Sequence, residues 1–329
     1  MKYENIAVLQ TARSIPKKIV TNDDLTTMMD TSDEWISKRT GIKQRHVVVD
    51  QTTSDLCIDV SQQLLKQAQL TADQIDLIVV ATMSPDYLTP SVSAMVQGAI
   101  GADKAVAFDL NAACSGFAYG LKVVKQMLIG DKVKHAILIG GETLSKLVNW
   151  QDRSTAVLFG DGAAGVLVTN DCSQDFGIMG SDLRTMGELG HFLTAGNWQN
   201  QSPFYKGENQ DPAEKYFLMN GRQVYKFATE NVPKSIVAAL KQANLTVADV
   251  DHFVLHQANR RIIERIARHL NVSLDKFPMN IQNYGNTAAA SEPILFDELV
   301  KKGMIKHGDI VVMSGFGGGL TIGTIVLKY

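Results

Sequence analysis

Short runs of apolar residues alternate with longer amphipathic stretches along most of the chain. The runs are typical of buried strands, and they cover residues 6–9, 76–82, 106–110, 135–140, 165–168, 252–256, 309–315 and 323–327. Two of the stretches between them, 54–70 and 232–245, carry apolar residues at helical spacing. Strands that alternate with helices predict an α/β protein in which helices cover a largely parallel sheet.

The second part of the chain repeats patterns of the first at a nearly constant distance. LTADQIDLIVVAT begins at Leu70, and the similar segment LTVADVDHFVLHQ begins at Leu245. VKHAILIGG matches KHGDIVVMSG with His135 against Asp309, which is almost the same offset. Apolar strands can look alike by chance, but two separate segments with almost one offset indicate a duplication. We predict two similar halves, 1–170 and 171–329, which share one core because no Pro-, Gly- or Ser-rich linker separates them.

Composition narrows the classes of protein. The chain has 329 residues, of which 45% are hydrophobic, so it can bury a sizeable core. Its net charge of -2 gives no general attraction to nucleic acid or to an anionic membrane. The first residues do not resemble a signal peptide, and no window approaches 18 uninterrupted apolar residues. Three cysteines without CxxC spacing argue against a disulfide scaffold or a zinc site, so we expect a cytoplasmic protein without metal.

One of these cysteines has an unusual position. In FDLNAACSGF, Cys114 ends an apolar run and opens a helix-like stretch. Unpaired backbone N–H groups at a helix N-terminus stabilise a thiolate, so we expect the pKa of Cys114 to be lowered. Its small neighbours leave room for a second reactant. A lone cysteine is often only a small buried side chain, and this is the interpretation for Cys57, on a helix stripe, and Cys172, in a polar loop.

Three further motifs favour a nucleophilic role for Cys114. His256 follows a buried strand, which is where ligands bind in open α/β sheets. Asn286 lies in a small-residue turn that corresponds, in the second half, to the turn of Cys114. Alone, these would be a core histidine and a turn asparagine, but together they are expected to face one crevice. FGGGLTIG adds a backbone that can approach a ligand, and an N–H there, with that of Cys114, could form an oxyanion hole.

These motifs carry a resemblance to a known family. Cys114 in NAACSGF, His256 in HQAN and Asn286 in YGNTAAAS resemble the triad of the β-ketoacyl-acyl-carrier-protein synthase III family. TSDEWISKRTGIKQRH and FGGG resemble the signatures near the two ends of that family, and the resemblance covers residues 1–329. It implies a thiolase-like, duplicated fold with five αβαβα layers, and a homodimer.

The resemblance also implies an acyltransferase that needs no cofactor. Such an enzyme starts type II fatty acid synthesis by moving a short acyl group from acyl-CoA to Cys114. Malonyl-acyl carrier protein then loses CO₂, and the resulting carbanion attacks the acyl-enzyme to give 3-oxoacyl-carrier protein. The N–H groups of Cys114 and Gly318 are expected to form the oxyanion hole, and His256 and Asn286 to stabilise the enolate.

Other positions are expected to bind the substrates. The amphipathic helix after His256 has an apolar stripe and a stripe of arginines, which independently suggests a surface for an acidic carrier protein. SPDYLTPS (84–91) resembles the family's loop that reaches across the dimer to the partner's acyl pocket. Thr89 stands there where the family often has a bulkier residue, so we expect branched or longer primers to be accepted besides acetyl-CoA. The resemblance assigns CoA binding to Trp35, Arg39, Thr40, Arg153, Gly221 and Asn259, carrier docking to Lys226 and Arg261, and the acyl pocket to Thr89 and Phe316. Arg265 of the arginine stripe and Arg260, which stands where the family usually has an aliphatic residue, are also expected to contact the carrier protein.

Alternatives remain open. Ketosynthases of secondary metabolism, chalcone-type synthases and hydroxymethylglutaryl-CoA synthases share a Cys–His–Asn triad, and use of malonyl-CoA in place of malonyl-carrier protein would favour them. A cysteine acyl-CoA hydrolase would release free acid without consuming malonyl groups. A non-catalytic binding module would leave Cys114 no more reactive than Cys57.

Overall fold

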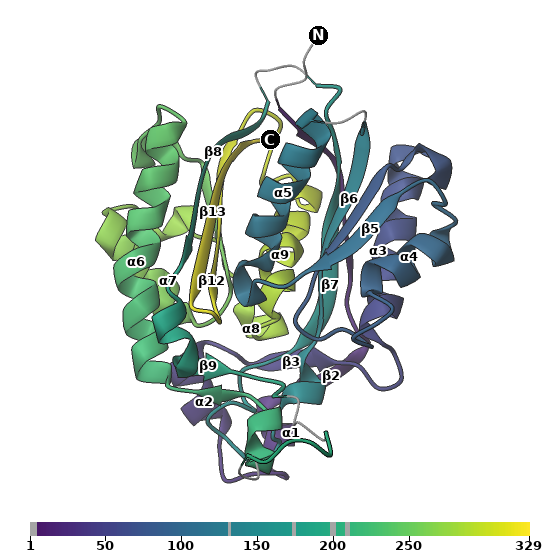
Figure 1. Ribbon diagram of the computed structural model, residues 1–329. Coiled ribbons are helices and arrows are strands. Elements are labelled where there is room, and N and C mark those ends of the chain that lie inside the picture. Colours follow the sequence, from purple (N-terminus) through teal and green to yellow (C-terminus); the bar gives the residue numbers. More distant parts are fainter. Residues whose placement is uncertain (1–4, 131–132, 173–175, 198–201, 208–210) are drawn as a thin grey trace.

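Five layers of secondary structure build the molecule, and Figure 1 shows them side by side. The computed structural model describes residues 5–130, 133–172, 176–197, 202–207 and 211–329. Two β-sheets enclose a central pair of helices, and further helices cover the outer face of each sheet. This confirms the predicted αβαβα architecture. No helix in the described ranges is both long and apolar enough to cross a bilayer.

The first sheet has five strands in the order β1-β7-β6-β4-β5. β4 is parallel to β5 and β6, whereas β7 is antiparallel to both β6 and β1. Four of the five strands thus run in one direction, as expected of a largely parallel sheet, and β7 runs against them. β6 leads into β7 without a crossover helix, and such a connection favours antiparallel pairing. The strands are β1 (Ala7–Ser14), β4 (Leu77–Ala81), β5 (Val106–Leu110), β6 (His135–Thr143) and β7 (Asp161–Thr169).

The second sheet repeats this arrangement with four strands in the order β11-β12-β13-β8. β11 and β12 are parallel, and β13 is antiparallel to β12 and β8, so the order matches that of β4, β6, β7 and β1 in the first sheet. This agreement supports the duplication, and the boundary at residue 170 stays a prediction. The strands are β8 (Gly177–Thr185), β11 (His252–Leu255), β12 (Ile310–Gly317) and β13 (Thr321–Lys328).

The helices occupy three layers. α5 and α9 lie between the sheets, α3 and α4 cover the first sheet, and α6 and α7 cover the second (Figure 1). Their bounds are α3 (Thr53–Ala68), α4 (Val92–Ile100), α5 (Gly116–Gly130), α6 (Gly221–Gln242), α7 (Arg260–Leu270) and α9 (Ser291–Lys301).

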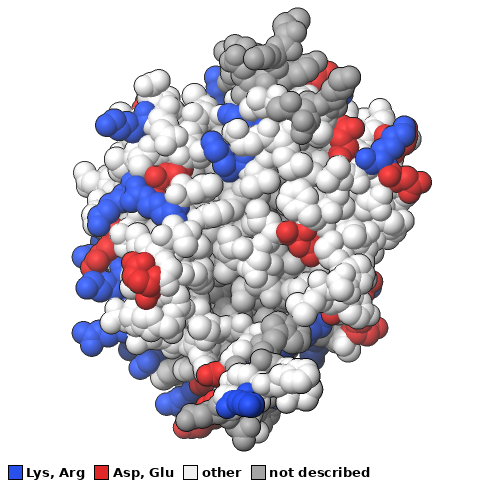
Figure 2. Space-filling model, in the orientation of Figure 1, with Lys and Arg blue, Asp and Glu red and all other residues white. Residues whose placement is uncertain are grey.

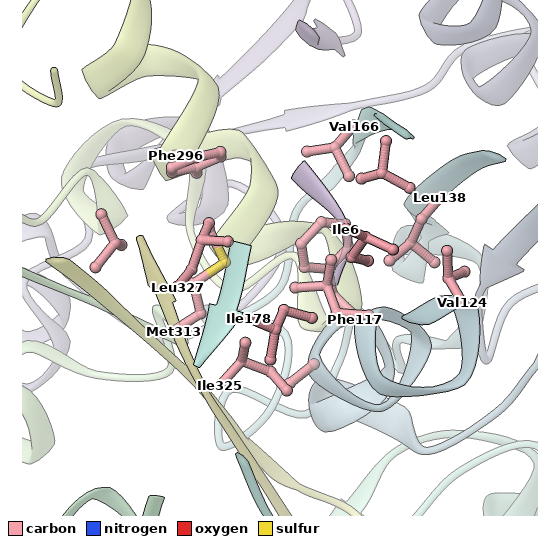
Figure 3. Packing of buried hydrophobic residues seen from close by; sticks show 14 of the residues in the cluster. Ile6, Phe117, Val124, Leu138, Val166, Ile178, Phe296, Met313, Ile325 and Leu327 are labelled. Carbon is pink, nitrogen blue, oxygen red and sulfur yellow. The ribbon is translucent and has the colours of Figure 1, made fainter. Parts of the chain in front are cut away.

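Side chains of both halves form one hydrophobic core around the central helices. Figure 3 shows Phe117 of α5 close to Leu138 of the first sheet and to Ile178 and Ile325 of the second. Phe117, Leu138 and Ile325 are fully buried. Because fully burying one such side chain contributes about 1.5–3 kcal/mol, the sheets and central helices hold each other in place.

Shorter elements gather at the lower end of Figure 1. Arg45 of β3 is fully buried there, and its guanidinium donates to the carbonyls of Val20 and Val157 and to Oδ1 of Asn22, so it ties this end to the core. The elements are β2 (Lys18–Thr21), β3 (Gln44–Val47), β9 (Leu193–Thr194), β10 (Leu218–Met219), α1 (Asn22–Leu25), α2 (Asp33–Thr40) and α8 (Ile281–Tyr284).

Two elements differ from the sequence pattern. The helix expected over 232–245 is the second part of α6, which begins well before it, at Gly221. Pro233 removes one backbone hydrogen bond of the helix. The helix continues through it because Phe227 and Ile236, on either side of the proline, pack on the same core. β8, with the sequence GIMGSDLRT, has too few apolar residues to be recognised and is defined by its pairing with β13.

Candidate active site

A cavity of about 740 Å³ opens at the end of the molecule where the shorter elements gather. Its size is that of a small-molecule site. Cys114, His256 and Asn286 all line it, although they come from three distant parts of the chain. The structure thus brings together the three residues that the sequence motifs singled out.

Cys114 lies in a tight turn between β5 and α5. The turn is the 3-10 segment η2 (Ala113–Ser115), and Ala113 has a left-handed φ of 45°. The side chain of Asn111 stabilises it by accepting a hydrogen bond from the N–H of Ala113 at 3.1 Å. On the opposite side, a Cβ placed on Gly317 would lie 2.7 Å from Sγ of Cys114, so the glycine is what allows β12 to pass this close to the sulfur.

The turn of Asn286 has the same construction. Its 3-10 segment is η8 (Ala288–Ala290), Ala288 has a φ of 41°, and Oδ1 of Asn286 accepts from the N–H of Ala288 at 2.9 Å. Asn286 therefore corresponds to Asn111 in the first half, and not to Cys114 itself. Its Oδ1 is engaged in the turn, so the side-chain NH₂ group is the part of Asn286 that can donate into the cavity.

His256 follows β11, and its backbone N–H donates to the carbonyl of Ser314 at 2.9 Å. The ring stands edge-on to Phe316, with 5.2 Å between the ring centroids. Burial lowers the pKa of His256 to about 3, because a charged imidazolium loses its hydration there. The side chain is thus a neutral imidazole that can donate one N–H.

The pKa of the Cys114 thiol is raised, which makes the expected lowering wrong. Burial is the largest cause, and the nearby carboxyls of Glu292 and Glu142 add to it. The backbone N–H groups of Gly318 and Cys114 act in the expected direction, but they are outweighed. The sequence shows the helix start, whereas the depth of burial depends on the whole fold.

Glu142 links the loop after β4 to the turn of Asn286. It is fully buried at the end of β6 and accepts hydrogen bonds from the hydroxyls of Thr82 and Ser84 and from the N–H of Met83. The N–H of Ala289, in the turn of Asn286, also lowers its pKa. Desolvation nevertheless prevails and raises the pKa of Glu142 to about 8. Burial thus favours the protonated form of Glu142, which accepts hydrogen bonds from both segments.

Trp35, Arg39 and Thr40 of α2 lie at the wall of the cavity. The guanidinium of Arg39 lies 4.5 Å from the centre of the Trp35 ring, and that of Arg153 lies 5.2 Å from it. Arg153 does not line the cavity, and it donates to the carbonyl of Asp30 at 2.8 Å. A planar ring that stacks on both Trp35 and Arg153 lies about 3.5 Å from each of them, which is the ordinary contact distance. The two side chains would therefore have to stand about 7 Å apart.

Other expected CoA residues also lie at this wall. Gly221 starts α6, and Asn259 caps α7 by accepting from the N–H of Arg261. The amide of Asn259 donates to the carbonyl of Arg39, which fixes α7 against α2. The hydroxyl of Thr40 donates to the carbonyl of Ile36, so it is engaged inside its own helix.

The four residues expected to dock a carrier protein are exposed on the side of α6 and α7. Lys226 belongs to α6, and Arg260, Arg261 and Arg265 belong to α7. Arg260 pairs with Glu264 at 2.8 Å, and Arg261 donates to the carbonyl of Lys38. Lys and Arg side chains line the corresponding edge of the molecule in Figure 2.

The two expected acyl-pocket residues are separated. Phe316 lines the cavity beside His256. Thr89 lies in an exposed loop after β4 and does not line the cavity of its own chain. That Thr89 lies at the acyl pocket of a second subunit stays a prediction.

Sequence motifs missed several lining residues. Phe159 and Phe217 stack on each other with ring centroids 4.0 Å apart, and both belong to the apolar cluster that contains Cys114. Met83 and Leu193 also line the cavity. These residues stand in no recognisable motif, because the chain folds them together from separate loops. Among the described residues, no three His, Cys, Asp or Glu side chains are grouped so that they could hold a metal ion.

Comparison with known proteins identifies the family of this arrangement. The model for 3-oxoacyl-[acyl-carrier-protein (ACP)] synthase III matches residues 108–187, and the model for the C-terminal part of that enzyme matches residues 240–329. The β-ketoacyl-[acyl-carrier-protein] synthase III of Lactobacillus helveticus is 64% identical over 329 residues, which is all of both chains. The chain belongs to the β-ketoacyl-[acyl-carrier-protein] synthase III family. The Levilactobacillus brevis enzyme of the same name is 60% identical, also over both full chains.

Solved structures agree with this assignment. The 3-oxoacyl-[acyl-carrier-protein] synthase III of Aquifex aeolicus superposes with a TM-score of 0.91 at 37% identity and covers 98% of this chain and 100% of its own. A priming β-ketosynthase from the R1128 polyketide pathway gives a TM-score of 0.90 at 31% identity, with 98% and 96% covered. The fold is therefore shared by a 3-oxoacyl-[acyl-carrier-protein] synthase III and a priming β-ketosynthase of a polyketide pathway.

Proposed function

We propose that this synthase III family member catalyses the initiating condensation of type II fatty acid synthesis, with Cys114 as nucleophile and with His256 and Asn286 as hydrogen-bond donors. The observation that carries the proposal is the meeting of these three side chains at one cavity of about 740 Å³. The full-length identity to named β-ketoacyl-[acyl-carrier-protein] synthases III supports it.

In the first stage, the sulfur of Cys114 attacks the carbonyl carbon of acyl-CoA. The bond from carbon to the CoA sulfur breaks, and the thiol proton ends on CoA. The N–H groups of Gly318 and Cys114 both act on the Cys114 sulfur, so they are close enough to stabilise the oxyanion that forms on the adjacent carbon. Burial keeps water from the thioester and disfavours hydrolysis.

In the second stage, malonyl-carrier protein enters and loses CO₂. The electron pair of the broken C–C bond forms an enolate on the thioester, and the N–H of His256 and the NH₂ of Asn286 donate to its oxygen. A neutral imidazole suits this role, since it donates without having to lose a charge. The enolate carbon then attacks the acyl group, and the Cys114 sulfur leaves and takes up a proton.

The CoA arm enters past α2 and the start of α7. Trp35 and Arg153 are the pair proposed to hold the adenine, with Arg39, Thr40, Gly221 and Asn259 along the arm. Because the guanidinium of Arg153 lies 5.2 Å from the Trp35 ring, adenine binding requires Arg153 to move aside. Arg153 contacts both the carbonyl and the carboxylate of Asp30. Because exposed ion pairs contribute little stability, these contacts can be exchanged for stacking on the adenine.

An acidic carrier protein docks on the basic surface formed by Lys226, Arg260, Arg261 and Arg265. These side chains lie on α6 and α7, whose first turns border the cavity, so a carrier bound there can deliver its arm to Cys114. Charge complementarity of this kind chiefly raises the association rate and depends on salt.

The working form is proposed to be a cytoplasmic homodimer without a cofactor. β5 is an edge strand of the first sheet, and Val106, at its start, is 56% exposed. Tyr87 and Leu88, in the loop of Thr89, are 60% and 74% exposed. Exposed apolar groups beside an open edge favour association. A second subunit would receive Thr89 at its acyl pocket, where the small side chain leaves room for branched primers.

A product assay tests the proposal. Wild-type protein with acetyl-CoA and malonyl-carrier protein is expected to yield 3-oxobutyryl-carrier protein and CO₂, and Cys114→Ser is expected to yield neither. Faster turnover with malonyl-CoA than with malonyl-carrier protein would instead support a secondary-metabolism ketosynthase. Release of acetate without malonyl consumption would support a hydrolase. An isobutyryl-CoA primer that stays inert would refute the pocket argument for Thr89.

A further inference from the structure

A second carboxyl group, that of Glu292, is buried behind the nucleophile and has no assigned role. Glu292 lies in the first turn of α9 and is fully buried. Neither of its two oxygens has a hydrogen-bond partner among the described residues. An ionised carboxylate without partners is very costly to bury, so burial raises the pKa of Glu292 well above its usual range. Burial thus favours the uncharged carboxylic acid over the carboxylate.

Its position connects it to Cys114. A Cβ placed on Gly315 of β12 would lie 2.4 Å from Oε1 of Glu292, 2.6 Å from the carbonyl oxygen of Cys114 and 2.7 Å from Cα of Ser115. The carboxyl and the backbone of the nucleophile turn therefore converge on the same spot, which is open only because residue 315 has no side chain. The carboxyl is also the largest charged influence on the pKa of Cys114.

Two other titratable groups of the described residues lie near Cys114. Glu142 of β6, with its four donors, also raises the pKa of Cys114, and neutral His256 lines the same cavity. The charged groups farther along α9 and on the strands next to it are satisfied elsewhere: Asp297 by Arg13 and Lys301, Glu298 by Lys302 and Asn280, and Asp161 by Ser145 and Val48.

We propose that Glu292 is a positioning residue for Cys114, which in its protonated form supports the nucleophile turn and in its ionised form suppresses the thiolate at alkaline pH. The inference rests on the proposed role of Cys114 as nucleophile. A carboxylate beside the sulfur opposes its ionisation, since like charges repel in a poorly solvated site. The two groups titrate as a coupled pair, so the effect appears only where Glu292 has lost its proton.

The test is the rate of Cys114 alkylation by iodoacetamide as a function of pH, followed by peptide mass spectrometry. Glu292→Gln removes the titrating group but keeps the shape, and Glu292→Leu removes it with an apolar side chain. The expected ratio of variant to wild-type rate is near one at pH 7 and rises about threefold or more above pH 9. Glu142 is present in the wild type and in both Glu292 variants, so its titration cancels in the ratio of alkylation rates.

Glu298→Gln is the matched control, because it removes a carboxyl from the same helix at a place that does not face Cys114. Its ratio is expected to stay near one throughout. A ratio for Glu292→Gln that is the same at every pH would overturn the proposal, because a merely structural role would change all rates alike. Failure of both Glu292 variants to fold, while Glu298→Gln folds, would also overturn it.

Alkylation needs neither CoA nor a carrier protein. A wild-type protein that fails to take up acetyl from acetyl-CoA would therefore refute the proposed function, whereas a flat rate ratio would refute only the role of Glu292.

Discussion

Gly317 passes close to the sulfur of Cys114, the proposed nucleophile, and this gives a sharp prediction for Gly317→Ala. The added Cβ would lie 2.7 Å from Sγ of Cys114 and 2.8 Å from its Cβ, whereas carbon atoms in ordinary contact stay about 3.5–4.0 Å apart. Cys114 or β12 must therefore move by roughly 1 Å. A displacement of about 1 Å in a reacting group can cost about a hundredfold in rate.

The assay is the rate at which Cys114 gains an acetyl group from saturating acetyl-CoA, measured by quenched-flow mass spectrometry. Gly317→Ala is expected to be about a hundredfold slower and still folded, since Gly317 is not among the residues with left-handed φ. Gly98→Ala is the control, because no atom lies within 4 Å of its added Cβ in the exposed part of α4. It should keep the rate and gain about 0.5–1 kcal/mol of stability. A folded Gly317→Ala protein with the wild-type rate would refute the geometry.

Three further predictions concern the remaining groups of the site. His256→Ala and Asn286→Ala should still form acyl-enzyme but lose about 10²–10³-fold in decarboxylation of malonyl-carrier protein; normal condensation by His256→Ala would contradict its role. Because the folded pKa of His256 is about 3 and its ordinary value is 6.5, the unfolded chain binds the proton first as pH falls. Wild type should therefore lose about 1.6 kcal/mol of unfolding free energy, relative to His256→Gln, between pH 6.5 and 5 in urea titrations. Arg265→Glu should raise KM for malonyl-carrier protein several-fold, more at low salt, and leave acetylation by acetyl-CoA unchanged; an equal effect of Lys241→Glu, at the far end of α6, would show that only net charge matters.

The sequence was most informative where short motifs coincide with strand ends. Cys114, His256 and Asn286 each follow or precede a buried element, so the periodicity of apolar residues located them and the fold brings them to one cavity. The common offset between the repeated segments likewise has a structural counterpart, since Asn111 and Asn286 stabilise equivalent turns. These turns could be recognised in the sequence because each of them is formed by residues that are neighbours along the chain.

Properties that depend on the surroundings could not be predicted in this way. The sign of the pKa shift of Cys114 is set by burial and by Glu292, which belongs to the other half of the chain. The stacked pair of Phe159 and Phe217 arises from two separate loops. The direction of β7 and the existence of β8 depend on pairing partners and not on their own apolar pattern.

Cys114 is proposed to carry the acyl group between two substrates, and a mass measurement can decide whether it does. Protein incubated with acetyl-CoA is digested, and the mass of the peptide containing Cys114 is followed before and after malonyl-carrier protein is added. We expect one acetyl group on Cys114, which disappears on addition as 3-oxobutyryl-carrier protein forms. An acetyl group on Cys57 or Cys172, or one on Cys114 that malonyl-carrier protein does not remove, would contradict it.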